Sequence, residues 1–193
     1  MALSAIALVS LAEEKAQLGI TDAAMDAILE GLIDAVSAAF NKEVDFTLAT
    51  TTYTNVYLDG NGRSVLYLPA APVGGAIGLA EDGTTLTEGP DKDFLLYADE
   101  GKIVKVNGTW LLGPKTLKLT MRAGFECLTP PTTLPADIKQ AAFKQVGYEY
   151  SRFLNKDWGT ESRSIGDRSV STKQVGLIED VKAVLRYHRR FGL

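Results

Sequence analysis

Two reactive side chains occur only once each in this sequence, as His188 and Cys127. A single histidine cannot supply a two-histidine zinc site, and a Ser-His-Asp arrangement would have to use His188, which lies in a basic C-terminal segment. Cys127 follows Glu126 and precedes Leu128, so it lacks the electropositive surroundings that make a thiolate reactive. A lone cysteine also excludes an intramolecular disulfide and a cysteine-built zinc site, and it fits a reducing compartment. We interpret both residues as structural.

Paired acidic residues are a second source of possible chemistry, because two carboxylates can bind calcium or serve as the acid and base of a glycosidase. Every pair lies in a glycine-containing turn, where turn geometry itself favours Asp and Gly. The pairs are Glu81/Asp82, Asp91/Asp93 and Asp99/Glu100. A hydrolase that uses Asp91 and Asp93 is therefore the weakest functional alternative.

Nucleotide chemistry has no complete motif in the chain. Gly60-Asn61-Gly62 begins like a dinucleotide fingerprint, but Val65 stands where the third glycine belongs. The stretch Asp59 to Arg63 instead predicts a hairpin turn between two antiparallel strands. The sequence contains neither a phosphate-binding loop nor a nucleophile elbow, so we expect no catalysis and no metal or organic cofactor.

Two helices are predicted near the N-terminus. Ser10 and Glu13 have the spacing of a capping box, which predicts a short helix to about Leu18. Thr21 or Asp22 is expected to cap a longer helix, whose apolar residues recur every three or four positions up to Phe40. The opposite face of this second helix carries Asp26, Glu30 and Asp34.

From Val44 the apolar period changes to two, which predicts β-structure. Further strands are expected from the stretches TTYTNVYL, SVLYLP, AIGLA, DFLLYA, KIVKV and TLKLTMRAGF, separated by turns rich in Gly, Asp and Pro. We therefore predict an antiparallel β region inserted between helices. Trp110 and Trp158 are either core or interface anchors, or stacking surfaces for a ligand.

After the prolines of TPPTTLP, Pro135 is expected to begin a central helix. A last helix is predicted from about Ile178 to Arg190, with cations near its end. The connection from Asn155 to Gly176 is long for a compact domain, and its middle, SRSIGDRSVST (Ser162 to Thr172), alternates like an edge strand for which we identify no partner strand.

These elements predict an α+β fold, a small helical bundle with an inserted antiparallel β-sheet domain. We expect N-terminal helices over residues 1–43, the β region over 44–130, and the central helix, interaction loop and last helix over 131–193. The opening MALSAIALVSLA has no preceding Lys or Arg and falls short of the ~20 residues that span a bilayer. We therefore expect cytoplasmic synthesis and no membrane association.

Charge is unevenly distributed along the chain. The formal net charge is −4, with seven acidic and two basic residues in 1–43 and seven acidic and eleven basic residues in 134–193. Opposite signs at the two ends are compatible with contacts between neighbouring subunits or with an acidic partner, and equally with ordinary solvated helix faces.

The order of elements resembles that of the head-tail connector, or adaptor, proteins of tailed double-stranded DNA bacteriophages. VSLAEEKAQLGI (Val9 to Ile20) is similar to the first helix of that family, and LPADIKQAAFKQVGYEYSRF (Leu134 to Phe153) is similar to its central helix. SRSIGDRSVST and VKAVLRYHRR resemble the loop and C-terminal helix that follow.

The resemblance implies a non-enzymatic virion protein at the head-tail interface. It would form a homo-oligomeric ring, expected to be dodecameric, that docks beneath the portal protein, contacts downstream neck or tail proteins and passes double-stranded DNA without reading its sequence. The 162–172 stretch would then be ordered by a neighbouring subunit or another partner. The alternative interpretation of this stretch is a solvated flexible loop that binds no partner. The residues expected at this subunit interface are Ser162, Arg163, Ser164, Ile165, Ser169, Val170 and Ser171.

Two more surfaces follow from charge. The basic end of the last helix is expected to face an acidic portal surface through Arg186, His188, Arg189 and Arg190. Asp26, Glu30 and Asp34 are expected to line the channel, because uncompensated bases there would retard a moving duplex. The open alternatives are another neck or tail-completion protein and a carbohydrate-binding β module that uses Trp110 and the tyrosines.

Overall fold

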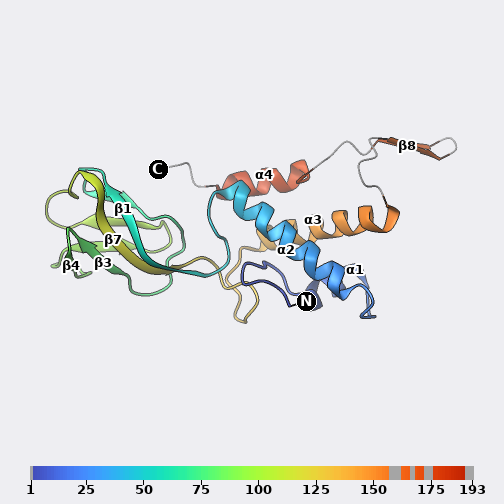
Figure 1. Ribbon diagram of the computed structural model, residues 1–193, viewed down its shortest axis with the longest axis horizontal. Helices are drawn as coiled ribbons and strands as arrows, with labels where there is room; N and C mark the ends of the chain where they lie inside the picture. The colour runs from blue at the N-terminus through green and yellow to red at the C-terminus, as the bar shows by residue number, and fades with distance from the viewer. Residues whose placement is uncertain (1, 157–161, 166–167, 172–175, 190–193) are drawn as a thin grey trace. The chain divides into compact units, whose positions relative to one another are not determined.

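The computed structural model describes residues 2–156, 162–165, 168–171 and 176–189. The chain divides into two compact units: a helical unit from Met1–Asp45 and Cys127–Phe191, and a β unit from Phe46–Glu126. Within the described residues the secondary structure comprises four helices and antiparallel sheets (Figure 1), so the predicted α+β class is confirmed.

The helical unit is a small bundle. Its helices are α1 (Leu11–Leu18), α2 (Asp26–Val44), α3 (Ala136–Asn155) and α4 (Glu179–His188). α2 packs against α3 and α4, and α1 packs against α2 and α3. The core side chains come from the apolar stripes, including Leu29, Ile33, Phe40, Ile138, Val146, Val181 and Leu185. None of the described helices is long and apolar enough to span a bilayer.

Hydrogen bonds between residues close in sequence determine where α1 and α2 begin. The predicted capping box is confirmed, because the Ser10 side chain accepts from the Glu13 N–H and the Glu13 carboxylate accepts from the Ser10 N–H. The predicted start of α2 at Thr21 or Asp22 is wrong. The Asp22 carboxylate accepts from the Ala24 N–H at 2.9 Å in a turn, and α2 begins four residues later, at Asp26.

The residues before α1 are part of the core. Ala7, Leu8 and Val9 are fully buried. The Leu8 N–H donates to the Ser37 hydroxyl at 3.1 Å, and that hydroxyl donates to the Ile33 carbonyl at 2.7 Å. The apolar opening of the sequence therefore packs along α2 and satisfies its backbone through a buried serine.

Two antiparallel sheets form the β unit (Figure 1). The four-stranded sheet has the order β1-β7-β3-β4, from Thr51–Gly60, Gly113–Ala123, Gly78–Glu81 and Thr84–Leu86. The three-stranded sheet has the order β2-β6-β5, from Val65–Tyr67, Lys102–Lys105 and Phe94–Tyr97. Both contribute to one core cluster, which includes Leu66, Phe94, Ile103, Trp110, Leu117 and Leu119.

Two predictions for this region are wrong. Val44 ends α2 and does not begin a strand, and Ala49 makes only an isolated bridge to Phe125. The stretch Asp59 to Arg63 does not join a hairpin, because β1 pairs with β7 whereas β2 pairs with β6. The turn residues are present, but long-range packing assigns the two strands to different sheets.

The stretch from Ser162 also differs from its prediction. β8 (Ser162–Ile165) pairs with β9 (Arg168–Ser171) in antiparallel register, from Ser162 opposite Ser171 to Ile165 opposite Arg168. The predicted lone strand therefore has a partner within the same stretch. The sequence signal for this pairing is Gly166-Asp167, a dipeptide that favours two-residue hairpins.

Candidate functional site

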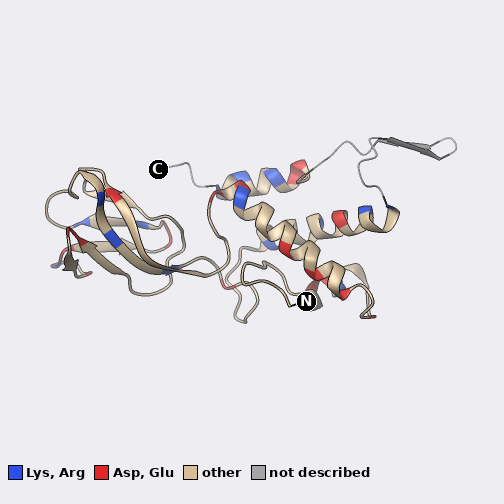
Figure 2. Cartoon of the chain, viewed as in Figure 1, with Lys and Arg blue, Asp and Glu red and all other residues tan. Residues whose placement is uncertain are grey.

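The end of α4 presents a basic and aromatic surface. Arg186 and Arg189 are exposed, and Tyr187 between them is 85% exposed. The helix buries Val181 and Leu185 on its other side, which places these residues toward solvent. Figure 2 shows the basic residues on α4. Arg190, predicted to belong to the same surface, lies outside the described residues.

His188 is held differently from its arginine neighbours. Its Nε2 lies 2.7 Å from the Asp137 carboxylate at the start of α3, and its ring contacts that of Tyr187 edge-on at 5.3 Å between centroids. Burial would raise the pKa of Asp137, but the hydrogen bonds from His188 and the Ile138 N–H outweigh it and lower that pKa. His188 therefore ties α4 to α3, in addition to any contact with a partner.

The acidic residues of α2 are half-buried, and two of them bind other parts of the same unit. Asp26 accepts from the Lys15 ammonium at 2.6 Å. Asp34 accepts from the Ser4 hydroxyl at 2.8 Å and from the Ser4 N–H at 3.1 Å. Glu30 lies between them, also half-buried. The exposed residues of α2 are four small, uncharged ones and a single lysine near its end: Ala27, Gly31, Ala35, Ala38 and Lys42.

The predicted interface stretch forms a sheet of only two strands among the described residues. Each strand therefore has one edge without a strand partner in this part of the chain. Ser162, Arg163, Ser164 and Ile165 belong to β8, and Ser169, Val170 and Ser171 belong to β9. Such edges can accept a strand from another chain.

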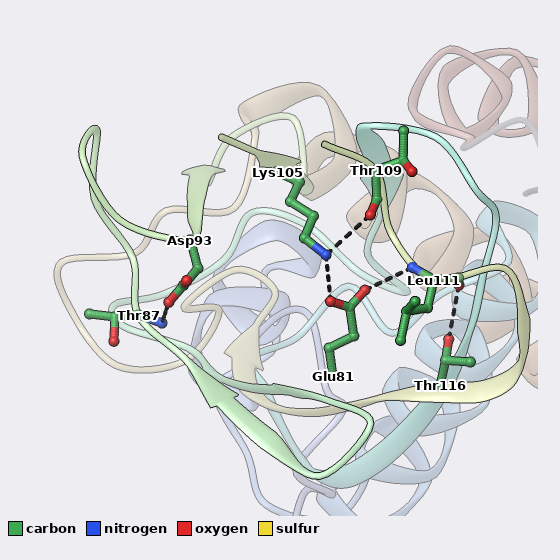
Figure 3. Close-up of polar contacts among 7 residues, drawn as sticks. All are labelled: Glu81, Thr87, Asp93, Lys105, Thr109, Leu111 and Thr116. Carbon is green, nitrogen blue, oxygen red and sulfur yellow. Dashed lines mark hydrogen bonds and ion pairs between the residues drawn. The ribbon is translucent and has the colours of Figure 1, made fainter. Parts of the chain in front are cut away.

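Other sequence candidates occupy structural positions. Trp110 is 1% exposed in the β-unit core, so it offers no stacking surface, and Trp158 lies outside the described residues. Glu81 is paired with Lys105 at 2.5 Å, and Asp93 accepts from the Thr87 N–H at 2.7 Å (Figure 3). Cys127 is buried. Within the described residues no cluster of His, Cys, Asp and Glu could hold a metal ion.

Glu14 is a feature that sequence reasoning missed. Its side chain is fully buried, and no described residue lies within hydrogen-bond distance of either carboxylate oxygen. Burial raises the pKa of Glu14 to about 7. The adjacent Glu13 instead pairs with Lys139 of α3 at 2.5 Å, which joins the acidic N-terminal segment to the basic C-terminal segment inside one unit.

Gln145 was missed as well, because an isolated glutamine in a helix carries no distinctive pattern. It is 1% exposed on α3. Its side-chain oxygen accepts from the Ile178 N–H at 2.9 Å, and its amide nitrogen donates to Glu149 at 3.1 Å. Since Ile178 is the N-cap of α4, Gln145 positions the start of the helix that carries the basic surface.

Comparison with known proteins places this arrangement among assembly proteins. The family model described as "Head completion protein" matches residues 7–191. None of the curated proteins matches the chain.

Solved structures show the same fold. A chain in the structure titled "Virion of native gene transfer agent (GTA) particle" is similar over 100% of this chain and 94% of its own, with 19% identity and a TM-score of 0.58. Chains in "Neck of empty GTA particle computed with C6 symmetry" and "Neck of native GTA particle computed with C12 symmetry" give 21% and 19% identity, TM-scores of 0.56 and 0.52, and the same coverage of both chains.

Proposed function

Because the chain belongs to the head completion protein family, we propose that it assembles into a closed ring beneath the portal of a phage-type particle, bridging capsid and tail. Membership confirms the expectation of a structural virion protein of the neck and not an enzyme. The ring, its copy number, its partners and the passage of DNA are the proposal.

The family match over residues 7–191 carries this proposal. The similar chains belong to necks computed with C6 and C12 symmetry, which suggests a ring of twelve copies here. A closed cyclic ring needs two different surfaces on each subunit, one to give and one to receive. The outer edges of β8 and β9, which have no strand partner among the described residues, are candidates for one of these, through Ser162–Ile165 and Arg168–Ser171.

In this proposal α2 faces the channel. Its exposed small residues carry no charge, and Asp26, Glu30 and Asp34 along its flank give a weakly negative surface. Duplex DNA binds cationic surfaces by releasing counterions. Since α2 exposes a single basic residue, Lys42 near its end, this wall would hold the duplex weakly and let it slide. Downstream neck or tail proteins would bind the end of the ring that lies opposite the portal.

The first test is the mass of the purified protein over a concentration series, measured by light scattering and followed by electron microscopy. We expect a species of about twelve subunits with an open centre about as wide as a DNA duplex. The same ring should join particles that carry a portal but lack this protein. A protein that stays monomeric and fails to join such particles would contradict the proposal.

A further inference from the structure

The outer face of the three-stranded sheet is apolar. Strand register places residues in rows across the sheet, and rows alternate between its two faces. The middle row, Leu66–Ile103–Leu96, belongs to or packs against the core. The rows on either side of it face the other way, and they consist of Val65–Val104–Leu95 and Tyr67–Lys102–Tyr97.

The four-stranded sheet of the same unit provides the contrast. Its central strand β7 buries Leu117, Leu119 and Met121, and exposes the alternate residues Lys118 and Thr120. This is the usual pattern for an antiparallel sheet with one wet face. The outer face of the three-stranded sheet departs from it, with Tyr67 50% and Tyr97 43% exposed beside half-buried aliphatic residues.

The single cation on this face does not make it a polar surface. The Lys102 ammonium lies 4.7 Å from the centre of the Tyr97 ring and 2.5 Å from the Glu100 carboxylate. The lysine is thereby held over the tyrosine, and the aliphatic row beside it remains partly exposed. A face of this composition is typical of a protein contact.

The same unit carries a projecting apolar feature, the pair Leu111 and Leu112, which we call the leucine knob. Leu111 is 47% and Leu112 80% exposed. The Leu111 N–H donates to Glu81 at 2.8 Å, and Glu81 holds Lys105, which donates to the Thr109 carbonyl at 3.1 Å (Figure 3). An ion pair that is largely buried therefore fixes the backbone of the knob.

Three further contacts restrain the knob. The Thr116 hydroxyl donates to the Leu111 carbonyl at 3.3 Å, and the Trp110 N–H donates to the Arg63 carbonyl at 2.9 Å. The backbone of Gly60 lies so close that a Cβ there would stand 1.7 Å from the Leu111 oxygen, so only glycine fits. Exposed leucines on so constrained a backbone lose little conformational entropy when they bind.

We propose that the leucine knob of one copy packs on the apolar outer face of the three-stranded sheet in the next copy, an inference that rests on the proposed ring. One unit thus supplies both the projecting and the receiving surface that a head-to-tail contact requires. Charge is compatible with the same pairing. The exposed Asp59, at the base of the knob, accepts from the Lys115 N–H at 2.7 Å and keeps its negative charge. Lys102, which Glu100 also binds, lies on the receiving face.

The test uses two cysteine substitutions, Leu112→Cys in the knob and Tyr97→Cys on the sheet face, combined in one chain and treated with a short bis-maleimide. Both positions are exposed, whereas the native Cys127 is buried. The protein is tested in assembled particles. We expect a ladder of cross-linked multimers, and a pair made with Thr85→Cys, on exposed β4, in place of Tyr97→Cys should give none.

A second variant measures the contribution of the knob. Leu112→Asp should raise the protein concentration needed for half-assembly at least tenfold, because it would place a charge where the proposed contact buries a leucine. Thr85→Asp should leave that concentration unchanged. If the ring forms without cross-links while both cysteines react with a monofunctional maleimide, the knob and the sheet face are both uncovered in the ring, and this inference fails while the proposed ring stands. Absence of the chain from particles would overturn both this inference and the proposed ring.

Discussion

At the scale of single residues, Glu14 should make stability depend on pH. Its pKa is raised from 4.5 to about 7 by burial, so the folded state holds a proton that the unfolded state releases. Between these values the folded state binds more protons, and stability must fall as pH rises from about 4.5 to 7. The full effect corresponds to about 3 kcal/mol.

The substitution Glu14→Gln removes this titration. We expect the variant to match the wild type near pH 4.5 and to exceed it by up to about 3 kcal/mol at pH 8, measured by urea unfolding across a pH series. Glu13 and Asp137 have lowered pKa values, so their contribution to stability is lost as the pH falls, at more acidic pH than the titration of Glu14. Glu88→Gln, at an exposed position, is the control. Equal pH profiles for Glu14→Gln and wild type would contradict this account.

Glu14 also shows what sequence could not predict at this scale. Glu13 and Glu14 are neighbours in the first turn of one helix, where both suit the helix dipole. Glu13 pairs with Lys139, whereas Glu14 is buried without a hydrogen-bond partner among the described residues. Only the packing of α1 on α2 and α3 distinguishes the two.

At the scale of elements, the basic end of α4 should bind an acidic portal surface. Reversing two exposed charges with Arg186→Glu and Arg189→Glu leaves the buried Val181 and Leu185 untouched, so the helix should still dock. We expect portal binding to fall at least tenfold, and wild-type binding to weaken as salt increases. Binding would be measured on isolated portal rings.

The control for this variant has the same change in net charge. Lys92→Glu and Lys118→Glu alter two exposed lysines of the β unit and leave α4 unchanged. They should leave portal binding within about twofold of wild type, because neither lysine belongs to the proposed contact surface and a single exposed charge contributes little to binding elsewhere. Equal binding by the α4 variant and the wild type would exclude this surface from the portal contact.

Elements specified by local signals were predictable, and those decided by distant contacts were not. The capping box of α1 and the apolar period of α2 depend on residues within a few positions of one another. The pairing of β1 with β7 joins residues far apart in sequence, and turn chemistry near Gly60 pointed to the wrong partner. The β8–β9 pairing was local, and the Gly166-Asp167 signal could have identified it.

At the scale of the whole molecule, the change of apolar period predicted an inserted β region, but not its two-sheet arrangement or the apolar outer face of one sheet. That face depends on register, which places Val104 between Val65 and Leu95. The candidate surfaces likewise needed structure: the acids of α2 are partly engaged within their own unit, and the leucine knob depends on the Glu81–Lys105 pair.

The division into two units leads to a last prediction, that residues 46–126 fold when expressed alone. This segment holds its own core cluster, and its ends are joined where the Thr50 N–H donates to the Phe125 carbonyl at 2.9 Å. We expect a cooperative urea transition with β-type circular dichroism. Phe94 is fully buried, so Phe94→Ala should cost about 3–5 kcal/mol and unfold a fragment this small.

In the full chain the same substitution separates the two units. Phe94→Ala should remove the β signal while the helical signal and its transition persist, because the helical unit buries a different set of side chains. Thr85→Ala, at an exposed position in the same unit, should change neither signal. Loss of helical signal together with the β signal would mean that the two units fold as one, and that the β region is not an independent insertion.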